Sequence, residues 1–251
     1  MAKIALVTGG SRGLGKNMAL KLALRGLEVI ITYHTKKEEA LQVVEEVKTM
    51  GRKAAALQLS VDDIRGFDSF FQQVAEVLKE TFNTERFDYL VNNAGIGMNV
   101  PFKETTEEQF DELMNVQFKG VYFFTQKALN YLNDGGGIVN ISSRLAQSSM
   151  PGYSAYASMK GAIETLTRYQ AKELSARGIK VNAVAPGPIA TDFARGIIRD
   201  NAQYNAAVTA VTALGRVGEP DDIGGVVAFL CTEDARWITA QRIEVSGGMN
   251  L

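Results

Sequence analysis

The stretch "KIALVTGGSRGLGKNMAL", residues 3–20, joins an apolar run to a turn with four glycines and then to a helical pattern. Residues 4–7 are all apolar, as expected of a strand that is covered on both faces. From Leu14 onward, apolar side chains recur at Met18 and Leu22, which is the spacing of a helix packed on a sheet. This stretch therefore predicts a strand, a glycine turn and a helix in immediate succession.

The rest of the chain repeats this alternation. Longer stretches with helical spacing, for example around Val74 and Leu113, separate short runs that are rich in β-branched residues. Such alternation calls for parallel strands joined by right-handed crossovers. No linker or shift in composition divides the chain, so we expect one α/β domain over residues 1–251 with about seven parallel strands. After the run at 3–8, the expected strands are 28–32, 53–59, 87–92, 137–142, 179–186 and 242–247.

Composition argues against several classes of partner. A formal net charge of -1 gives no field that would attract nucleic acid or an anionic membrane. The single cysteine, Cys231, excludes an intrachain disulfide, and the single histidine, His34, has no companions for a metal site. The first residues are too short an apolar run for a signal segment or a membrane span. We therefore expect a cytoplasmic protein without a metal.

The glycine turn has the features of a phosphate site. The N–H groups that open a helix have no partner within it, and the helix dipole adds positive potential there. Glycines at 9, 13 and 15 would let a diphosphate approach those groups, and Ser11 and Arg12 would add donors. Their order is G-x-x-x-G-x-G, which differs from the general G-x-G-x-x-G fingerprint. A tight turn with a purely structural role remains the alternative at this point.

Five motifs stand in a particular order. They are TGGSRGLG at 8–15, NNAG at 92–95, a serine within NISSR at 140–144, YASMK at 156–160 and PGPIAT at 186–191. In order and spacing, over essentially the whole chain, they resemble the short-chain dehydrogenase/reductase family. The resemblance implies a doubly wound Rossmann sheet of order 3-2-1-4-5-6-7 with helices on both faces, a nicotinamide cofactor and carbonyl/alcohol redox chemistry. It also implies cofactor contacts from Gly9, Ser11, Arg12, Gly13, Leu14, Gly15, Asn93, Ala94, Gly95, Tyr156, Lys160, Pro186, Gly187, Ile189 and Thr191.

Tyr156 and Lys160 are the predicted acid–base pair. They are four residues apart on a helix, so both side chains leave the same face. A nearby ammonium would lower the pKa of the phenol, which is ordinarily about 10. Tyr156 would then act as general acid in reduction, with Lys160 tuning it and holding the nicotinamide ribose. Ser143 precedes Tyr156 by the family separation of 13 residues and would hydrogen-bond the substrate oxygen, whereas Ser142 points the opposite way.

One position departs from the family pattern. Related sequences commonly read N-x-K-G, and the asparagine assists a proton relay through water near the lysine. Here the segment reads Gln117-Phe118-Lys119-Gly120. Asn115 would lie on the opposite face of a helix, about 200° away. Glutamine keeps a donor and an acceptor, so we expect Gln117 to serve the relay.

The end of the second predicted strand bears on cofactor choice. An acidic residue there would accept the adenosine ribose hydroxyls and repel a 2′-phosphate. This chain has Tyr33 at that place, followed by His34, Thr35 and Lys36, so NADP(H) is favoured over NAD(H). Alternatively, Lys36 belongs to a solvent-exposed helix start and does not contact the cofactor. Ser60 stands where the family often has an aspartate near the adenine, and Ser60 and the following Val61 are predicted cofactor contacts.

The substrate region is the segment 187–216, which is too long for a simple connection and suits a lid. Opposite it we expect a largely apolar wall. Arg195 and Arg199 in the lid segment could meet an acidic carrier protein, or could form a solvated charged face. The wall is predicted to consist of Arg144, Leu145, Met150 and Tyr153.

Three functions are compatible with these residues. The first is an NADPH-dependent ketone reductase that resembles 3-oxoacyl-carrier-protein reductases and broad carbonyl reductases, with a substrate that is free or carrier-bound. The second is a sugar or polyol dehydrogenase, and the third an NADP(H)-sensing protein with little catalysis. Apolar residues beyond one stripe in segments 107–132 and 152–176, together with the resemblance, favour a homotetramer or homodimer.

Overall fold

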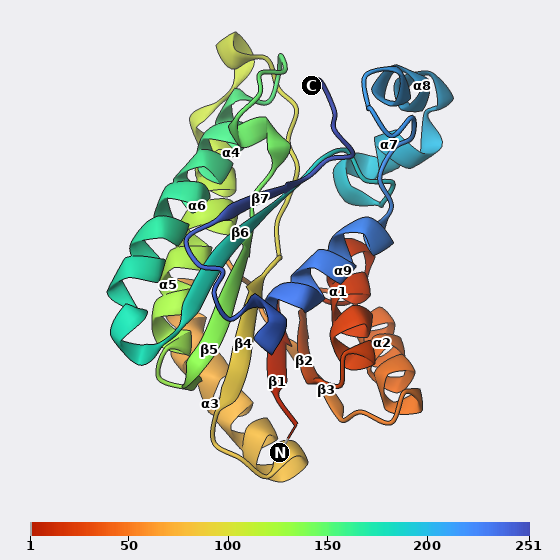
Figure 1. The fold of residues 1–251 in the computed structure, drawn as a ribbon. Helices are drawn as coiled ribbons and strands as arrows, with labels where there is room; N and C mark the ends of the chain where they lie inside the picture. Colours follow the sequence, from red (N-terminus) through yellow and green to blue (C-terminus); the bar gives the residue numbers. More distant parts are fainter. Residues whose placement is uncertain (1) are drawn as a thin grey trace.

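Seven parallel strands form one sheet in the order β3-β2-β1-β4-β5-β6-β7. The computed structural model describes residues 2–251, except for the side chains of Ala194 and Arg195. Both the α/β class and the strand order predicted from the sequence are confirmed (Figure 1). The strands are β1 (Ile4–Val7), β2 (Glu28–Tyr33), β3 (Ala54–Gln58), β4 (Phe87–Asn92), β5 (Leu132–Ile141), β6 (Lys180–Pro186) and β7 (Arg242–Val245).

The start of β5 differs from the prediction. The sequence run suggests a strand that begins at residue 137, whereas β5 begins at Leu132, which pairs with Phe87. The register then shifts before Gly137 pairs with Tyr89. The residues between these two pairs are polar or glycine, so the apolar pattern did not predict the first part of the strand.

Helices cover both faces of the sheet. Buried apolar side chains of α1 (Gly13–Leu24), α2 (Lys37–Thr49) and α9 (Pro220–Leu230) pack into one core, and those of α3 (Phe67–Val77), α5 (Gly120–Ala128) and α6 (Ser154–Glu173) into another (Figure 1). The helix α4 (Glu107–Met114) continues into α5 through a π-helical turn at Asn115–Lys119. Burial on both faces explains why the central strands are apolar at successive positions.

Amide side chains connect the two central strands to the helices that carry the site. The amide of Asn92 on β4 donates to Asn140 Oδ1 on β5 at 2.8 Å and to Thr125 Oγ1 on α5 at 2.9 Å. The amide of Asn140 in turn donates to Thr167 Oγ1 on α6 at 2.9 Å. Because all these groups are buried, a lost partner would cost roughly 1–3 kcal/mol. The network fixes α5 and α6 relative to the ends of β4 and β5.

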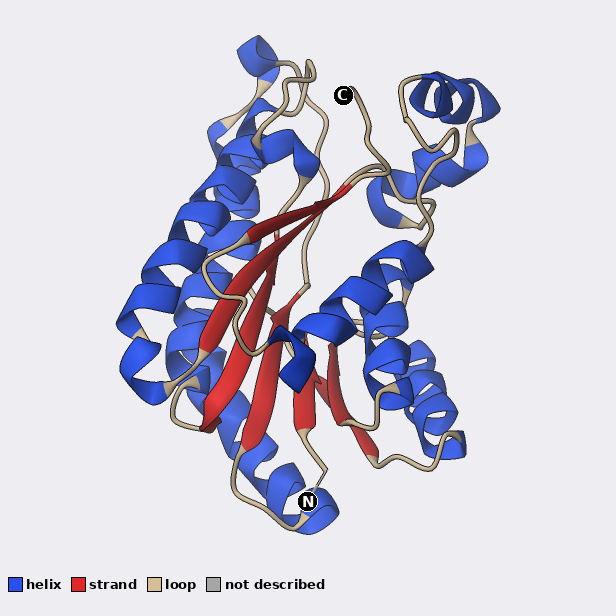
Figure 2. Cartoon of the chain, in the orientation of Figure 1, coloured by secondary structure: helices blue, strands red, loops and turns tan. Residues whose placement is uncertain are grey.

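The carboxyl ends of the strands meet at one edge of the sheet, where open α/β folds bind ligands. Figure 2 shows loops that leave this edge toward the top of the view, where α7 (Ile197–Asp200) and α8 (Ala202–Ala210) also lie. Both short helices belong to the segment between β6 and α9. Within residues 2–251, no helix is long and apolar enough to cross a membrane.

Candidate active site

The glycine turn after β1 leaves its backbone open to an anion. Gly9 and Gly13 have positive φ values of 67° and 54°, which side chains rarely adopt. A Cβ on Gly15 would lie 2.1 Å from the Gly9 carbonyl oxygen. Helix α1 then starts at Gly13 without a side-chain cap and without an acidic residue in its first turn. Its free N–H groups and positive dipole end fit the diphosphate of a dinucleotide.

The segment after β4 lies against this turn. The Asn93 amide donates to the Thr8 carbonyl at 2.8 Å and to the Gly9 carbonyl at 3.2 Å. Thr8 Oγ1 accepts from the backbone N–H groups of Asn93 and Ala94 at 2.9 and 3.0 Å. The predicted contacts Asn93, Ala94 and Gly95 therefore stand beside the glycine turn, as expected of residues that share one ligand.

The strand that leads to the lid lies near the same turn. Gly187 donates to the Val245 carbonyl at 2.9 Å, directly after β6 ends at Pro186. Ile189 forms an isolated bridge with Gly218. The buried Thr191 side chain lies 3.8 Å from the position of a Cβ on Gly13. Thr191 therefore lies at the mouth of the turn that holds Ser11, Arg12 and Leu14, and Gly187 and Ile189 precede it in the same segment.

The end of β2 carries no carboxylate between residues 31 and 36. Tyr33 is buried there, whereas His34, Thr35 and Lys36 are exposed. Two other predicted contacts have partners within the protein. Lys36 pairs with Glu39 at 3.4 Å, and Arg12, half-exposed, is 3.8 Å from Asp192.

Ser60 lies next to this strand end, followed in the chain by Val61. Its hydroxyl donates to Asp62 Oδ1 at 2.5 Å and is 3.4 Å from His34 Nε2. The hydroxyl that was expected near the adenine is therefore already engaged with neighbours. Val61 is partly buried against the core below β3.

Tyr156 and Lys160 on α6 are both buried. Lys160 Nζ lies 5.7 Å from the centre of the Tyr156 ring and donates to the Ile141 carbonyl at 2.8 Å. Burial lowers the pKa of Lys160 to about 7. Burial also raises the pKa of Tyr156 above its usual value, and the hydrogen bond with Ser143 acts in the opposite direction. The two groups are close enough for the charge of one to bias the protonation of the other.

Two adjacent serines end β5 and face different neighbours. Ser143 is extended, and its Oγ accepts from the Leu145 N–H at 3.2 Å while it also hydrogen-bonds Tyr156. Ser142 instead donates to Glu164 Oε1 at 2.8 Å. Both hydroxyls therefore meet α6, but at different residues: Ser143 bonds the tyrosine, whereas Ser142 bonds Glu164 and the Lys160 carbonyl.

Gln117 lies in the π-helical turn between α4 and α5 and is buried. Its Nε2 donates to the Ile96 carbonyl in the loop after β4. Its Oε1 is buried without a hydrogen-bond partner in the described part of the chain. A Cβ on Gly95 would come within 2.8 Å of that oxygen and would force the Gln117 amide to shift. The amide thus keeps one acceptor for a further polar group.

An apolar wall stands next to Tyr156. Leu145 and Tyr153 pack with Tyr156, Ile96 and Met98 in one cluster. The ring centres of Tyr153 and Tyr156 are 6.5 Å apart. Two of the four predicted wall residues therefore contact the tyrosine cluster.

Two lid residues that the sequence reading missed complete this wall. Phe193 lies 6.2 Å from the Tyr156 ring centre, and the Tyr204 hydroxyl is 3.7 Å from Met150 Sδ. Burial, together with Tyr204, raises the pKa of Tyr153. Their aromatic side chains, within a segment already predicted to be a lid, were the signal that could have identified both residues as part of an apolar pocket.

Arg144 does not join the wall. Its Nη1 donates to Glu244 Oε1 at 3.0 Å and its Nη2 to the Asn250 carbonyl at 3.5 Å. The guanidinium therefore faces β7 and the C-terminal residues, because two acceptors are available there. The prediction that Arg144 lines the pocket is not supported by these contacts.

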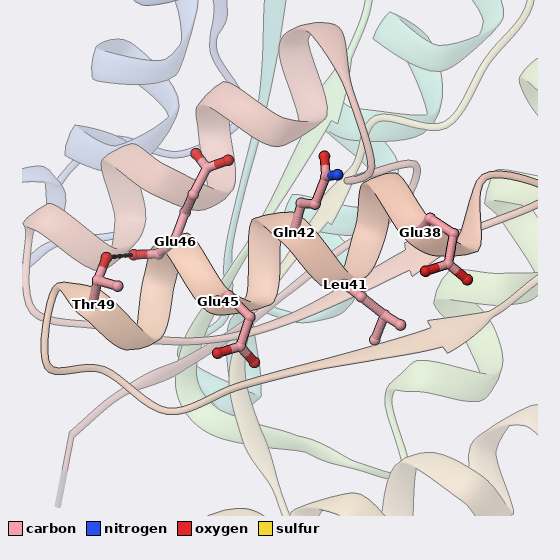
Figure 3. A pocket seen from close by; sticks show the side chains of 6 residues that line it. All are labelled: Glu38, Leu41, Gln42, Glu45, Glu46 and Thr49. Atoms are coloured by element: carbon pink, nitrogen blue, oxygen red, sulfur yellow. Dashed lines mark hydrogen bonds between the residues drawn. The ribbon is translucent and has the colours of Figure 1, made fainter.

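Other surface features carry no part of this arrangement. Figure 3 shows a depression on α2, where Thr49 Oγ1 donates to the Glu46 carbonyl at 2.7 Å. None of the predicted site residues contributes to it, and three of its side chains are glutamates. Among the described residues, no group of three His, Cys, Asp or Glu side chains is arranged to hold a metal. The depression is lined by Glu38, Leu41, Gln42, Glu45, Glu46 and Thr49.

Comparison with known proteins agrees with this geometry. Residues 9–250 match a family model described as enoyl-(acyl carrier protein) reductase. A 3-oxoacyl-[acyl-carrier-protein] reductase of Staphylococcus aureus is 38% identical, with 99% of this chain and 98% of that protein covered.

Two solved structures are also similar. One is the angucycline C-6 ketoreductase LanV with bound NADP, which is 37% identical with a TM-score of 0.93, covering 99% of this chain and 95% of that one. The other is LugOII, a promiscuous reductase that catalyses keto-reduction at C1 during lugdunomycin biosynthesis. It is 35% identical with a TM-score of 0.94, and 99% and 98% of the two chains are covered.

Replacing Gln117 by Asn tests the unpartnered amide. We expect turnover to stay the same or rise, because Asn keeps a donor and an acceptor while the shorter side chain gives up the bond to Ile96. The matched control is Gln117→Leu, which keeps the bulk and loses the amide, and it should lower turnover. Steady-state NADPH oxidation would measure both, and complete inactivity of the Asn variant would contradict the assignment.

Proposed function

Because the chain belongs to the short-chain dehydrogenase/reductase family, we propose that it reduces a ketone to a secondary alcohol with NADPH. The observation that carries this proposal is the buried Tyr156, which has Ser143 as a hydrogen-bond partner and Lys160 beside its ring. Tyr156 can donate a proton, Ser143 can donate a hydrogen bond that stabilises charge on the substrate oxygen, and Lys160 supplies a positive charge. As a member of this family, the chain is an oxidoreductase that acts on C=O or CH–OH groups.

The residues divide the chemistry between them. When bound, a reduced nicotinamide would be the source of the hydride for the carbonyl carbon. Ser143 accepts the Leu145 N–H, and its own proton, which can bond to Tyr156 before substrate arrives, can be donated to the substrate oxygen, where negative charge develops. Tyr156 donates its proton to the same oxygen, which completes the alcohol.

Lys160 and Gln117 serve the step after proton donation. Charged Lys160 stabilises the phenolate that Tyr156 becomes. The unpartnered Oε1 of Gln117 can accept a hydrogen bond from water that returns a proton toward this pair. Both roles depend on groups that are buried, where electrostatic effects are stronger than in water.

Preference for NADP(H) rests on the end of β2 and on Arg12. No carboxylate stands there to repel a 2′-phosphate, and His34, Thr35 and Arg12 are exposed enough to meet one. The similar ketoreductase LanV has NADP bound. Arg12 is held only loosely by Asp192, at 3.8 Å, so a phosphate can compete for it.

The substrate we propose is a bulky, largely apolar ketone. Leu145, Tyr153 and Met150 form one side of its site, and Phe193 and Tyr204 of the lid segment 187–216 form the other. Aromatic side chains of this kind stack on flat ring systems, as a polycyclic ketone offers. A sugar or polyol would need more amides and carboxylates than these side chains supply.

A carrier-bound 3-oxoacyl ketone is the second candidate, because the reductase of Staphylococcus aureus is a relative. The side chains of the lid segment give less support to a carrier-bound substrate. Arg199, one of the two arginines predicted to meet an acidic carrier, is paired with Asp192 at 2.5 Å and with Asp200 at 2.7 Å. The side chain of the other, Arg195, lies outside the described residues.

The domain and assembly assignments remain proposals as well. We infer a single dinucleotide-binding domain over residues 1–251, in the cytoplasm, where the buried thiol of Cys231 would stay reduced. Tyr122 on α5 and Tyr169 on α6 are large exposed side chains on the helices expected to pair between subunits of a tetramer or dimer. Apolar groups exposed in this way mark contact surfaces.

Tyr156→Phe is the direct test of the mechanism. The ring and its packing stay, but the proton donor is lost, so kcat should fall by about 100-fold or more. Activity would be followed as NADPH oxidation with polycyclic aryl ketones, β-ketoesters and sugars. Tyr131→Phe, a tyrosine far from the site, is the matched control and should be unchanged. Full activity of the Tyr156 variant would overturn the mechanism, and inactivity of the unaltered protein on every ketone would favour an NADP(H) sensor.

Arg12→Ala tests the cofactor assignment. Losing one charged donor to a phosphate should raise KM for NADPH by about tenfold, and KM for NADH should change little. Arg25→Ala, at the other end of α1, serves as the control. An equal change in both KM values would show that Arg12 does not contact the 2′-phosphate.

The pH dependence follows from Lys160. Because burial lowers its pKa to about 7, the side chain loses its charge as the pH rises through neutrality. Below that pH the ammonium stabilises the phenolate formed in reduction, so kcat/KM for the ketone should decrease as pH increases. Lys160→Met should be slower and independent of this ionisation. A wild-type profile that rises from acid to alkaline pH would contradict this role.

A further inference from the structure

The carboxylate of Glu164 is buried on α6, one helical turn after Lys160, and the proposed chemistry does not use it. It accepts hydrogen bonds from three separate segments. Oε1 accepts from Ser142 Oγ at 2.8 Å and from Arg242 Nε at 2.7 Å, and Oε2 accepts from Gln147 Nε2 at 3.0 Å. One carboxylate thus connects α6, the end of β5, the loop that follows it and β7.

A second carboxylate extends this connection. Glu244 on β7 accepts from Arg242 Nη1 at 2.9 Å and from Arg144 Nη1 at 3.0 Å. The result is a chain of alternating charge that runs from Glu164 through Arg242 and Glu244 to Arg144. Both arginine side chains are mostly covered, with exposures of 16% and 15%, so solvent screens these pairs only weakly.

The two ends of this chain lie on either side of Ser143. Ser142 is bound to Glu164, and Arg144 is bound to Glu244. Besides its bond with Tyr156, the Ser143 Oγ accepts the N–H of Leu145, a neighbour on the same short turn. The backbone position of Ser143 relative to Tyr156 is therefore set by the residues that flank it.

We propose that Glu164 is a positioning residue that, through Ser142 and the Arg242–Glu244–Arg144 chain, holds Ser143 against Tyr156. This rests on the proposed function, in which the Ser143 hydroxyl binds the substrate oxygen. A buried ion pair is weak support for stability alone, because desolvation of the charges offsets their attraction. A hydroxyl that must meet a developing charge needs close positioning, and a misplacement of about 1 Å can cost up to about 100-fold in rate.

The test is a double-mutant cycle between Glu164 and Ser143. Glu164→Gln keeps the size of the side chain but removes its charge and the acceptor for Gln147. We expect kcat to fall about tenfold in the wild-type background and not to fall further in the Ser143→Ala background. KM for NADPH should change less than twofold, because the glycine turn lies elsewhere. Glu173→Gln, an exposed position on the same helix, is the control and should leave kcat unchanged.

The possible outcomes distinguish a role of Glu164 in positioning Ser143 from a role in folding stability alone. The active fraction of each variant is measured by NADPH titration, and kcat is expressed per binding site. An unchanged kcat per site, or an equal loss in both backgrounds, would overturn the proposal. Should Glu164→Gln fail to fold, Ser142→Ala removes one neutral link and is expected to give the same pattern more weakly. If Ser143→Ala alone left kcat intact, the proposed function would fail rather than the role of Glu164.

Discussion

Within the described part of the chain, the ammonium of the buried Lys160 has one hydrogen bond, to the Ile141 carbonyl at the end of β5, 2.8 Å away. Removing a cation from water is costly, and the protein recovers only part of this cost through that bond. The rest appears as a pKa lowered to about 7. The fold therefore keeps a lysine whose charge is readily lost beside a phenol whose burial disfavours ionisation. An anionic phenolate next to this lysine would relieve both penalties at once, which is the condition that proton donation to a ketone creates.

The sheet makes this arrangement possible. Parallel strands bring the carboxyl ends of β1, β4, β5 and β6 to one edge, so the glycine turn, the Asn93 segment, Ser143 and the lid meet although they are far apart in sequence. The Asn92–Asn140 network fixes α6 to the same strands. It thereby fixes the position of Tyr156 along the helix relative to Ser143 at the end of β5. Glu164 accepts hydrogen bonds from Ser142, which precedes Ser143, and from Arg242 on β7.

Much of this architecture could be predicted from the sequence. Apolar runs predicted all seven strands, most clearly the central ones, which are buried on both faces. Five motifs in register led to the family and its strand order. The early start of β5 escaped because its first pair is followed by polar and glycine residues. Within the site, helical spacing was sufficient to bring Tyr156 and Lys160 together, and the family separation of 13 residues singled out Ser143. Contacts between distant segments were not accessible in this way. Arg144 turned toward Glu244, and the lid aromatics Phe193 and Tyr204 and the buried Glu164 were missed, because no local pattern encodes their partners.

The chemistry of this site depends on a shift of the Lys160 ionisation by burial, and nuclear magnetic resonance can measure this shift directly. Protein labelled with ¹³C and ¹⁵N in lysine would be titrated without cofactor, and the Lys160 signal would be identified by its loss in Lys160→Met. We expect one lysine that titrates near pH 7 and disappears in that variant. A Lys160 signal that titrates near the ordinary lysine value of about 10.4 would contradict it.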